Sequence, residues 1–125
     1  MFIIIFLIVF LAPTSIWADD HPVTCSGDIV STLQTAINAT DAADTVTIGA
    51  GSCTLSDTIT LTDKNITVQG GGIGVTNITF TGGSGWKVEM TNSTGSPEQR
   101  AWRLSSMTLN TDALTGRWLV IYAEG

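Results

Sequence analysis

Three side chains combine metal-binding or redox chemistry with a defined place in the sequence: the single histidine, His21, and the two cysteines, Cys25 and Cys53. A zinc site built from cysteine and histidine needs four ligands at close, characteristic spacing, and these three residues lack that spacing. In an oxidising compartment the two cysteines are better suited to one disulfide, with two free buried thiols as the alternative. The chemistry they favour is therefore covalent pairing of the thiols.

The start of the chain indicates which compartment these residues meet. Residues 2–12, FIIIFLIVFLA, are an unbroken apolar run that is followed by PTSIWA and then by two acids. This order is typical of a secretory signal peptide over residues 1–18, cleaved after Ala18. A membrane anchor is the alternative, but 11 apolar residues are too few to cross a bilayer core of about 30 Å. The mature chain is therefore expected to be secreted or extracytoplasmic, either extracellular or periplasmic.

Cleavage after Ala18 gives His21 a candidate role of its own. The mature chain would begin Asp19–Asp20–His21, with histidine in the third position. A free amine, two backbone amides and an imidazole in this order can bind Cu(II) or Ni(II) in a square plane. The alternative is an incidental amino-terminal tail over residues 19–27. No other cofactor is evident from the sequence.

The charge balance excludes two classes of partner. The chain has 5 Lys and Arg residues against 11 Asp and Glu residues, a formal net charge of −6. An acidic chain poor in basic residues lacks the electrostatic features that bind nucleic acid or anionic lipid. We therefore expect no nucleic-acid partner and, after signal removal, no membrane association, while the oligomeric state stays open. The loop acids Asp41, Asp44, Asp57 and Asp63 do not have the spacing of a calcium site.

One helix and a series of short strands must position these side chains. In residues 28–40, DIVSTLQTAINAT, apolar residues recur at helical intervals, and Asp28 stands where a carboxylate suits the positive end of the helix dipole. After this segment, short runs alternate apolar residues with threonine and are separated by Gly, Asn, Asp and Ser. We predict a helix over 28–40 that is followed by strands alone.

The strand-like runs repeat. They share the order Thr or Asn, β-branched apolar, Thr, apolar, and they are TVTI (45–48), TITL (58–61), NITV (65–68) and NITF (77–80). Val46 is matched by Ile66 after 20 residues, and Ile59 by Ile78 after 19. A repeat of this length with two strands is typical of a solenoid. Alternation places the aliphatic side chains on one side of each strand and threonine on the other.

A coil of parallel strands explains this pattern better than a sandwich of hairpins. Hairpins need tight two-residue turns, which the stretches between the runs do not contain, whereas stacked repeats align like residues in ladders around a narrow core. The open end of such a coil exposes unpaired backbone groups. The helix at 28–40 is placed to cover that end, and a Cys25–Cys53 bond would fasten it there. The predicted fold is all-β, with residues 44–125 forming the first coils.

The series DIVSTLQTAINAT, DTVTIGAGSCTL and KNITVQGGGIGVTNITF resembles the amino-terminal cap and first coils of the pectate-lyase-like superfamily of right-handed parallel β-helix proteins. In that superfamily a cap helix precedes a strand with the pattern GDTV-x-aliphatic-PAG. Here Ala43 stands in place of the first glycine and Gly49 in place of the proline. The resemblance covers roughly residues 25–80. It implies a right-handed parallel β-helix with a capping helix, in a secreted protein similar to polysaccharide lyases and hydrolases.

The resemblance implies a structural role for this segment, because the shared residues are architectural and the catalytic groups of such proteins usually lie on later coils. The catalytic residues therefore stay unknown, whether the protein is an enzyme stays open, and calcium is implied only for a longer protein. The alternative function is a non-catalytic extracellular adhesion or carbohydrate-binding β-helix. Both versions make a polysaccharide the candidate partner.

Three further features bear on binding and on the extent of the chain. Trp118 is the candidate for contact with sugar rings, because an exposed tryptophan offers a large flat apolar face. Four Asn-x-Ser/Thr triplets would accept glycans in a eukaryotic secretory pathway, and they begin at Asn38, Asn65, Asn77 and Asn92. Residues 117–125, RWLVIYAEG, are strand-like and apolar on both faces, which predicts that the chain is the leading fragment of a longer protein.

Overall fold

A computed structural model describes residues 18–62, 64–82, 88–91 and 102–110. In chain order, the described elements are β1 (Asp20–Val23), β2 (Gly27–Asp28), α1 (Val30–Ala39), β3 (Thr45–Ile48), β4 (Gly51–Leu55), β5 (Ile59–Thr62), β6 (Thr67–Gly70), β7 (Thr76–Phe80), β8 (Val88–Thr91), β9 (Arg103–Ser105) and β10 (Thr108–Asn110). Short strands thus dominate, as the alternating pattern predicts, and one helix interrupts them near the amino terminus.

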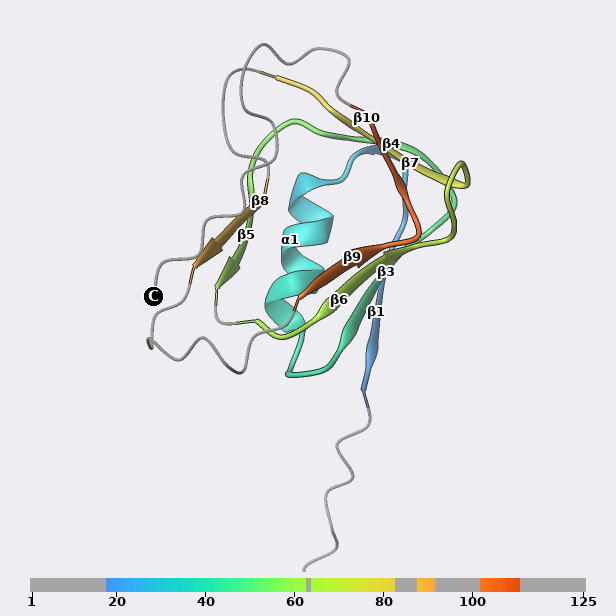
Figure 1. The fold of residues 1–125 in the computed structure, drawn as a ribbon. Helices are drawn as coiled ribbons and strands as arrows, with labels where there is room; N and C mark the ends of the chain where they lie inside the picture. Colours follow the sequence, from blue (N-terminus) through green and yellow to red (C-terminus); the bar gives the residue numbers. More distant parts are fainter. Residues whose placement is uncertain (1–17, 63, 83–87, 92–101, 111–125) are drawn as a thin grey trace, which may run out of the picture.

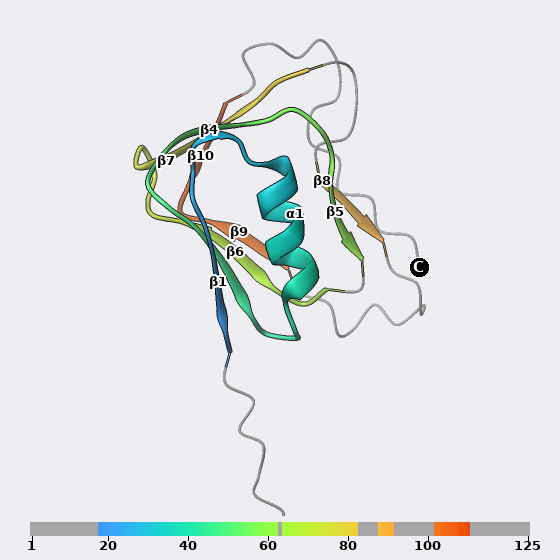
Figure 2. The same ribbon diagram turned by 180° about the vertical axis from the view of Figure 1, so that it is seen from behind.

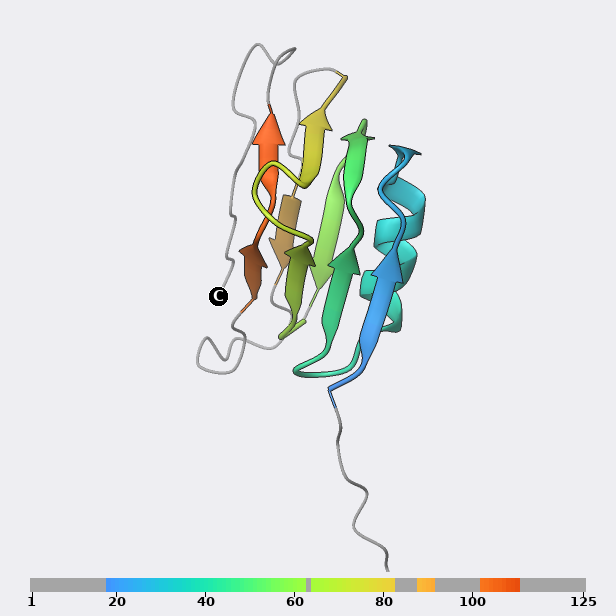
Figure 3. The same cartoon turned by 90° about the vertical axis from the view of Figure 1, so that its right-hand side faces the viewer.

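The described strands pair only in parallel and form three sheets. Sheet A has the order β1-β3-β6-β9, sheet B the order β2-β4-β7-β10, and sheet C is the pair β5-β8. Along the chain, β1 and β2 are followed by α1; the later strands enter sheets A, B and C in turn, then A, B and C again, and then A and B. Figure 1 shows the three sheets around the interior, and Figure 3 shows α1 beside β1 at one end of the stacked strands.

Alternation along each strand places the aliphatic side chains in the interior. In β3, Val46 and Ile48 are buried, whereas Thr45 and Thr47 are half-buried on the outer side. The parallel register stacks like residues on one another, so that Val46 lies beside Val68 of β6. Burying a Val, Leu, Ile or Phe side chain stabilises a fold by about 1.5–3 kcal/mol. The core is therefore the space that the three sheets and α1 enclose.

The predicted repeat is wrong in its register. Val46 pairs with Val68, two positions beyond the predicted partner Ile66. The TITL and NITF runs, predicted to be equivalent, belong to different sheets, because β5 lies in sheet C and β7 in sheet B. Each complete passage through sheets A, B and C contains three strands, β3, β4 and β5 and then β6, β7 and β8, whereas the predicted repeat has two and leaves out β4. The connections between strands differ in length, so runs of like composition do not occupy equivalent positions.

Residues 19–27, predicted to be a tail, contribute strands to two sheets. β1 pairs with β3 at the edge of sheet A, and β2 pairs with β4 at the edge of sheet B. The sequence conceals these strands because β1 contains charged residues and a proline and β2 has two residues. Pro22 is compatible with β1 because an edge strand has one side on which no ladder bond is needed.

The helix predicted over 28–40 is confirmed as α1, Val30–Ala39, which is slightly shorter at both ends. The Asp28 Oδ1 atom accepts a hydrogen bond from the Val30 amide at 3.2 Å, as expected for a carboxylate at this end of a helix. Leu33 and Ile37, one turn apart, are the fully buried side chains of the helix. Seen from the opposite side to Figure 1, α1 and β1 lie in front of the later strands β6 and β9 (Figure 2).

The carboxyl end of α1 is held by a lysine from a distant loop. The Lys64 ammonium donates to the carbonyl oxygens of Asn38 at 3.2 Å and Thr40 at 2.6 Å. The last carbonyl groups of a helix have no partner within it, and they lie at the negative end of its dipole. Lys64 therefore provides both hydrogen bonds and a matching charge where the helix needs them.

The Gln34 side chain joins α1 to the edge of sheet C. Its Nε2 atom donates to the Thr60 carbonyl at 2.9 Å, and its Oε1 atom accepts from the Thr60 amide at 2.8 Å. Thr60 lies in β5, whose other edge pairs with β8. A neighbouring strand would make the same two bonds to this residue. One helix side chain thus satisfies backbone groups that an edge strand leaves unpaired.

Replacing Gln34 with methionine is expected to lower the free energy of unfolding by about 1–3 kcal/mol, because the Thr60 amide and carbonyl lose their partners in a half-buried position. Urea denaturation followed by circular dichroism measures the change. The matched control is Thr35→Met on the same helix, since the Thr35 hydroxyl bonds only within α1, to the Ser31 carbonyl. Equal losses in the two variants would contradict the edge-strand role of Gln34.

The turn before β3 contains Ala43 in the left-handed region, with a φ of 73°. Its amide donates to the Asn65 carbonyl at 2.8 Å, which holds the turn against the connection that precedes β6. This is the position where the resembled superfamily has glycine. The Gly49 amide, in the place of that superfamily's proline, donates to the Val23 carbonyl at 2.9 Å and so ties β3 to β1.

Ala43→Gly is expected to raise the free energy of unfolding by about 0.5–1 kcal/mol, because glycine adopts a positive φ without the steric cost that alanine has there. Ala42→Gly is the control. Ala42 is exposed and is not among the positive-φ residues, so glycine there should cost a few tenths to about 1 kcal/mol through chain entropy. Thermal unfolding of both variants tests whether the two changes have opposite signs; a loss at both positions would refute the prediction.

Candidate functional site at the amino-terminal strand

Asp44 is a charged side chain with almost no access to solvent, at 4% exposure. It directly precedes β3, and its two oxygens receive three contacts. Oδ1 accepts the Asp19 amide at 2.8 Å, Oδ2 accepts the Asp41 amide at 2.7 Å, and His21 Nε2 lies 3.2 Å from Oδ2. These contacts join the residues just before and within β1 to the turn that leads into β3. They define the candidate site.

The hydrogen bonds keep this carboxylate ionised. The amides of Asp19 and, next, Asp41 lower the pKa of Asp44 below its ordinary value of 3.8; burial opposes them, and His21 adds to the lowering. An ionised carboxylate can only accept hydrogen bonds, so Nε2 of His21 carries the hydrogen in this contact. The pair therefore fixes the orientation of the imidazole as well as the position of β1.

The lowered pKa of Asp44 predicts an acid-sensitive contribution to stability. A folded-state pKa below 3.8 means that the contribution is complete above about pH 4, near the unfolded pKa, and is lost as the pH falls through the lower folded value. We expect Asp44→Asn to unfold at a lower temperature than the parent protein at pH 6, and this difference to shrink toward pH 2. Thermal melts across this range measure it. A difference that stays constant with pH would contradict the assignment.

The predicted copper or nickel motif has a defined place in this site. His21 lies within β1, which is extended and paired with β3, and its ring contacts Asp44. The backbone nitrogen of Asp19 also faces Asp44. Chelation in a square plane requires these same groups to converge on a metal, so residues 19–21 would first have to leave β3. The motif stays a prediction. In the described part of the chain, no group of three or more His, Cys, Asp or Glu side chains is arranged to hold a metal ion.

The predicted disulfide is present. Cys25 and Cys53 form a bond with an S–S distance of 2.05 Å. Cys25 lies between β1 and β2, and Cys53 lies in the centre of β4. The bond therefore fastens the chain just before α1 to sheet B, which is the attachment that the sequence predicts for the helix.

The remaining candidate residues lie apart from Asp44. Asn38 is exposed on α1, where its Oδ1 accepts from Gln34 at 2.9 Å. Asn65 is half-buried before β6, and Asn77 is half-buried in β7 with its Nδ2 donating to the Gly74 carbonyl at 3.2 Å. Their use as glycan acceptors stays a prediction. Asn92, Trp118, Asp63 and residues 1–17 of the predicted signal peptide lie outside the described residues.

Sheet B carries ordered polar rows on its outer side. The parallel register places Ser52 beside Asn77 and Asn77 beside Thr108. A second row follows two residues further along each strand, with Thr54, Thr79 and Asn110 side by side. Hydroxyl and amide groups at the regular spacing of a sheet, about 4.8 Å, form a flat surface with both donors and acceptors.

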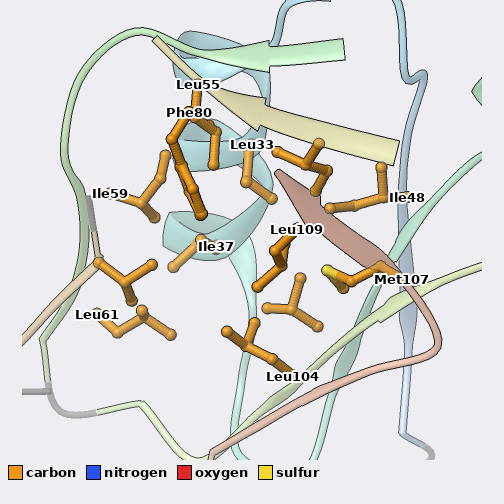
Figure 4. Close-up of a pocket in the computed structure, with 13 residues that line it drawn as sticks. Leu33, Ile37, Ile48, Leu55, Ile59, Leu61, Phe80, Leu104, Met107 and Leu109 are labelled. Atoms are coloured by element: carbon orange, nitrogen blue, oxygen red, sulfur yellow. The ribbon is translucent and has the colours of Figure 1, made fainter. Parts of the chain in front are cut away.

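An apolar cavity of about 30 Å³ lies in the interior, and Figure 4 shows the side chains that converge on it. Its lining comes from α1 and from all three sheets: Leu33, Ile37, Ile48, Leu55, Ile59, Leu61, Val68, Ile78, Phe80, Val88, Leu104, Met107 and Leu109. No polar side chain is among these described lining residues, so they offer nothing that would orient a polar substrate or hold a water molecule. The described lining is therefore apolar core, and the buried polar side chains in the described part of the chain are Thr40, Asp44 and Thr76.

The fold and the site define a mostly-β protein with parallel sheets, one short helix, one disulfide and an amino-terminal strand held by a buried carboxylate. No family model, curated protein or solved structure matches this chain. Among the described residues, no helix has the length and apolar character needed to cross a membrane.

Proposed function

We propose that this chain is the capped beginning of a right-handed parallel β-helix in a secreted protein that resembles pectate-lyase-like, polysaccharide-degrading enzymes. In this proposal the described residues are structural: they close one end of the coil and set the register for the strands that follow. The observation that carries the proposal is the recurrence of strands in the order A, B, C along the chain, each pairing in parallel with the strand one passage earlier.

The capping role of α1 is supported by its place and its contacts. The helix follows β1 and β2, where a later passage has its sheet C strand. Gln34 bonds the Thr60 amide and carbonyl at the edge of β5, and the buried Leu33 and Ile37 cover the core beneath. Stacked repeats need a terminal unit that satisfies the last strand and shields the last layer of core. A short helix locked by a disulfide fits that need.

Secretion is supported by two independent features. The apolar run over residues 2–12 has the length of the apolar core of a signal peptide, and the segment PTSIWA after it ends in a small residue, Ala18, suited to cleavage. The Cys25–Cys53 disulfide is a bond that persists in oxidising compartments and is rare in the cytosol. The two features agree on a destination outside the cytoplasm.

A second candidate function is carbohydrate binding without catalysis. The polar rows of sheet B favour it, because hydroxyl and amide side chains in register match the donors and acceptors that a polysaccharide presents at regular intervals. Trp118, predicted to contact sugar rings, belongs to this alternative.

Two assays on the purified protein separate these functions. With polygalacturonate and calcium, we expect no release of unsaturated uronate products, which is read as ultraviolet absorbance; turnover would overturn the structural proposal. Co-sedimentation with insoluble polysaccharide tests the second candidate. Binding that is lost in Ser52→Ala/Thr79→Ala, on sheet B, and kept in Gln69→Ala, on the outer side of sheet A, would establish carbohydrate binding. Absence of both activities is the result expected for a structural cap.

A further inference from the structure

The backbone nitrogen of Asp19 lies against a buried hydrogen-bond acceptor, the Asp44 carboxylate. It lies 2.8 Å from Asp44 Oδ1, and the Asp19 carbonyl accepts the Thr45 amide at 2.9 Å. Residue 19 is therefore fixed on both sides of its backbone just before β1 begins. It is also the residue that would follow the predicted cleavage site at Ala18.

We propose that Asp44 is the binding site for the mature amino terminus, and that the α-ammonium group of Asp19 forms an ion pair with its carboxylate after signal-peptide removal. This inference rests on the secretory part of the proposed function. A signal peptidase hydrolyses the Ala18–Asp19 bond: water adds its hydroxyl to the Ala18 carbonyl carbon and a hydrogen to the Asp19 nitrogen. The new amine then takes a proton from solvent and becomes the cation that Asp44 binds.

Cleavage strengthens a contact that already has the required geometry. The same nitrogen changes from a neutral amide to a cation, so a hydrogen bond with one ionised partner becomes a bond between two opposite charges, which adds their Coulomb attraction. The carboxylate is buried, and its other contacts are the Asp41 amide and the His21 ring. A buried carboxylate without a full counter-charge gains more from a new cation than an exposed one does.

The ion pair would make stability depend on correct maturation. A chain that keeps its leader, or that is cut at another bond, places an amide or no group at all against Asp44. The strand β1 and the edge of sheet A beside it would then be held less firmly. The mature form is the one that locks the first strand of the fold.

The first test identifies the terminus. The full chain is expressed with its leader in a secreting host, and the exported protein is analysed by intact mass and amino-terminal sequencing. We expect Asp19 as the first residue. Retention in the cell with the leader intact would refute the secretory part of the proposed function. Export with another first residue would refute this inference alone.

The second test moves the amine by one residue. A glycine inserted between Ala18 and Asp19 leaves the mature net charge unchanged but turns the Asp19 nitrogen back into an amide. We expect the inserted protein to melt about 4–8 °C below the parent, the shift typical of a small domain that loses one strong contact. In an Asp44→Asn background this difference should vanish. Equal melting temperatures of the parent and the glycine-inserted protein would overturn the proposal. A difference between them that persists in the Asp44→Asn background would overturn it as well.

A chemical measurement covers the case in which Asp44→Asn does not fold. At one fixed pH, an N-hydroxysuccinimide ester acylates free α-amines, and peptide mass spectrometry reads the modified terminus. We expect the α-amine of the parent to react about tenfold more slowly than that of the glycine-inserted protein, which is the ratio that corresponds to about 1.4 kcal/mol of protection. Equal rates in the two folded proteins would show that Asp44 does not hold the terminus.

Discussion

Replacing Gly70 with alanine is expected to lower the free energy of unfolding by about 3 kcal/mol, at the upper end of the usual cost of overpacking a core. A β-carbon at Gly70 would overlap the Ser106 carbonyl oxygen, and it would lie 2.8 Å from the Met107 β-carbon and 3.0 Å from the Thr76 β-carbon. The first two contacts are shorter than real β-carbons show, and the third is tight. Backbone atoms and β-carbons cannot move aside by a rotamer change, so relief requires the corner between β9 and β10 to shift.

Gly49→Ala is the matched control for this variant. The added β-carbon would meet the Val23 carbonyl oxygen at 3.6 Å, an ordinary van der Waals contact. We therefore expect a change within about 0.5 kcal/mol at Gly49, as for an ordinary surface substitution. Urea denaturation followed by tryptophan fluorescence and by circular dichroism measures both variants. A Gly70→Ala protein as stable as Gly49→Ala would mean that the corner at Ser106 does not approach β6 as closely as described.

Removal of the disulfide has the other large expected effect. The Cys25–Cys53 bond closes a loop with a sequence separation of 28 residues. In the chain-entropy account, a cross-link of this span stabilises the folded state by about 3–4 kcal/mol, because it restricts the unfolded chain. Domains of this size are commonly stable by about 5–15 kcal/mol in total, so the double variant Cys25→Ala/Cys53→Ala should lose a large fraction of its stability.

The stability lost with the disulfide should be concentrated in one part of the structure, the segment that leads into α1. β2 has two residues and begins two positions after Cys25, so without the bond the entry to α1 depends on few contacts. Thermal melts of the parent with and without dithiothreitol, beside the double variant, test the assignment. Reductant should lower the melting temperature of the parent toward that of the variant and leave the variant unchanged. A parent that is indifferent to full reduction would contradict a stabilising role for the bond.

Local patterns predicted the elements well where each element depends on its own residues. The TVTI run is β3 with the predicted bounds, and the 28–40 segment contains α1. Both follow from periodicity, because a strand alternates sides and a helix returns to one face within four residues. The cysteine pairing was predictable for a different reason: two cysteines in a chain with a predicted export signal allow one intramolecular bond.

The pairing of strands was not predictable from the repeated tetrapeptides. Val46 meets Val68 and Ile59 meets Val88, and the separation differs between the two sheets because the connecting loops differ in length. Composition alone cannot distinguish neighbouring Thr-aliphatic runs, since each satisfies the same alternation. The register of the paired strands therefore depends on the lengths of the loops that connect the sheets.

The candidate site was hidden for the same reason. Asp44 was predicted to be one of several loop acids, and His21 part of a tail; the sequence places them 23 residues apart. They meet because β1 lies beside β3 in parallel register. A burial-dependent contact between distant residues leaves no periodic trace in the chain.

The sequence by itself thus determined the alternation of short strands, the one helix, the acidic character and the single disulfide pair, because each depends on neighbouring residues or on composition. The tertiary structure alone decided the three-sheet order, the bonds that Gln34 and Lys64 make at the ends of elements, and the burial of Asp44 against Asp19. These depend on segments that are distant in the chain and adjacent in space, and only parallel pairing with loops of unequal length brings them together.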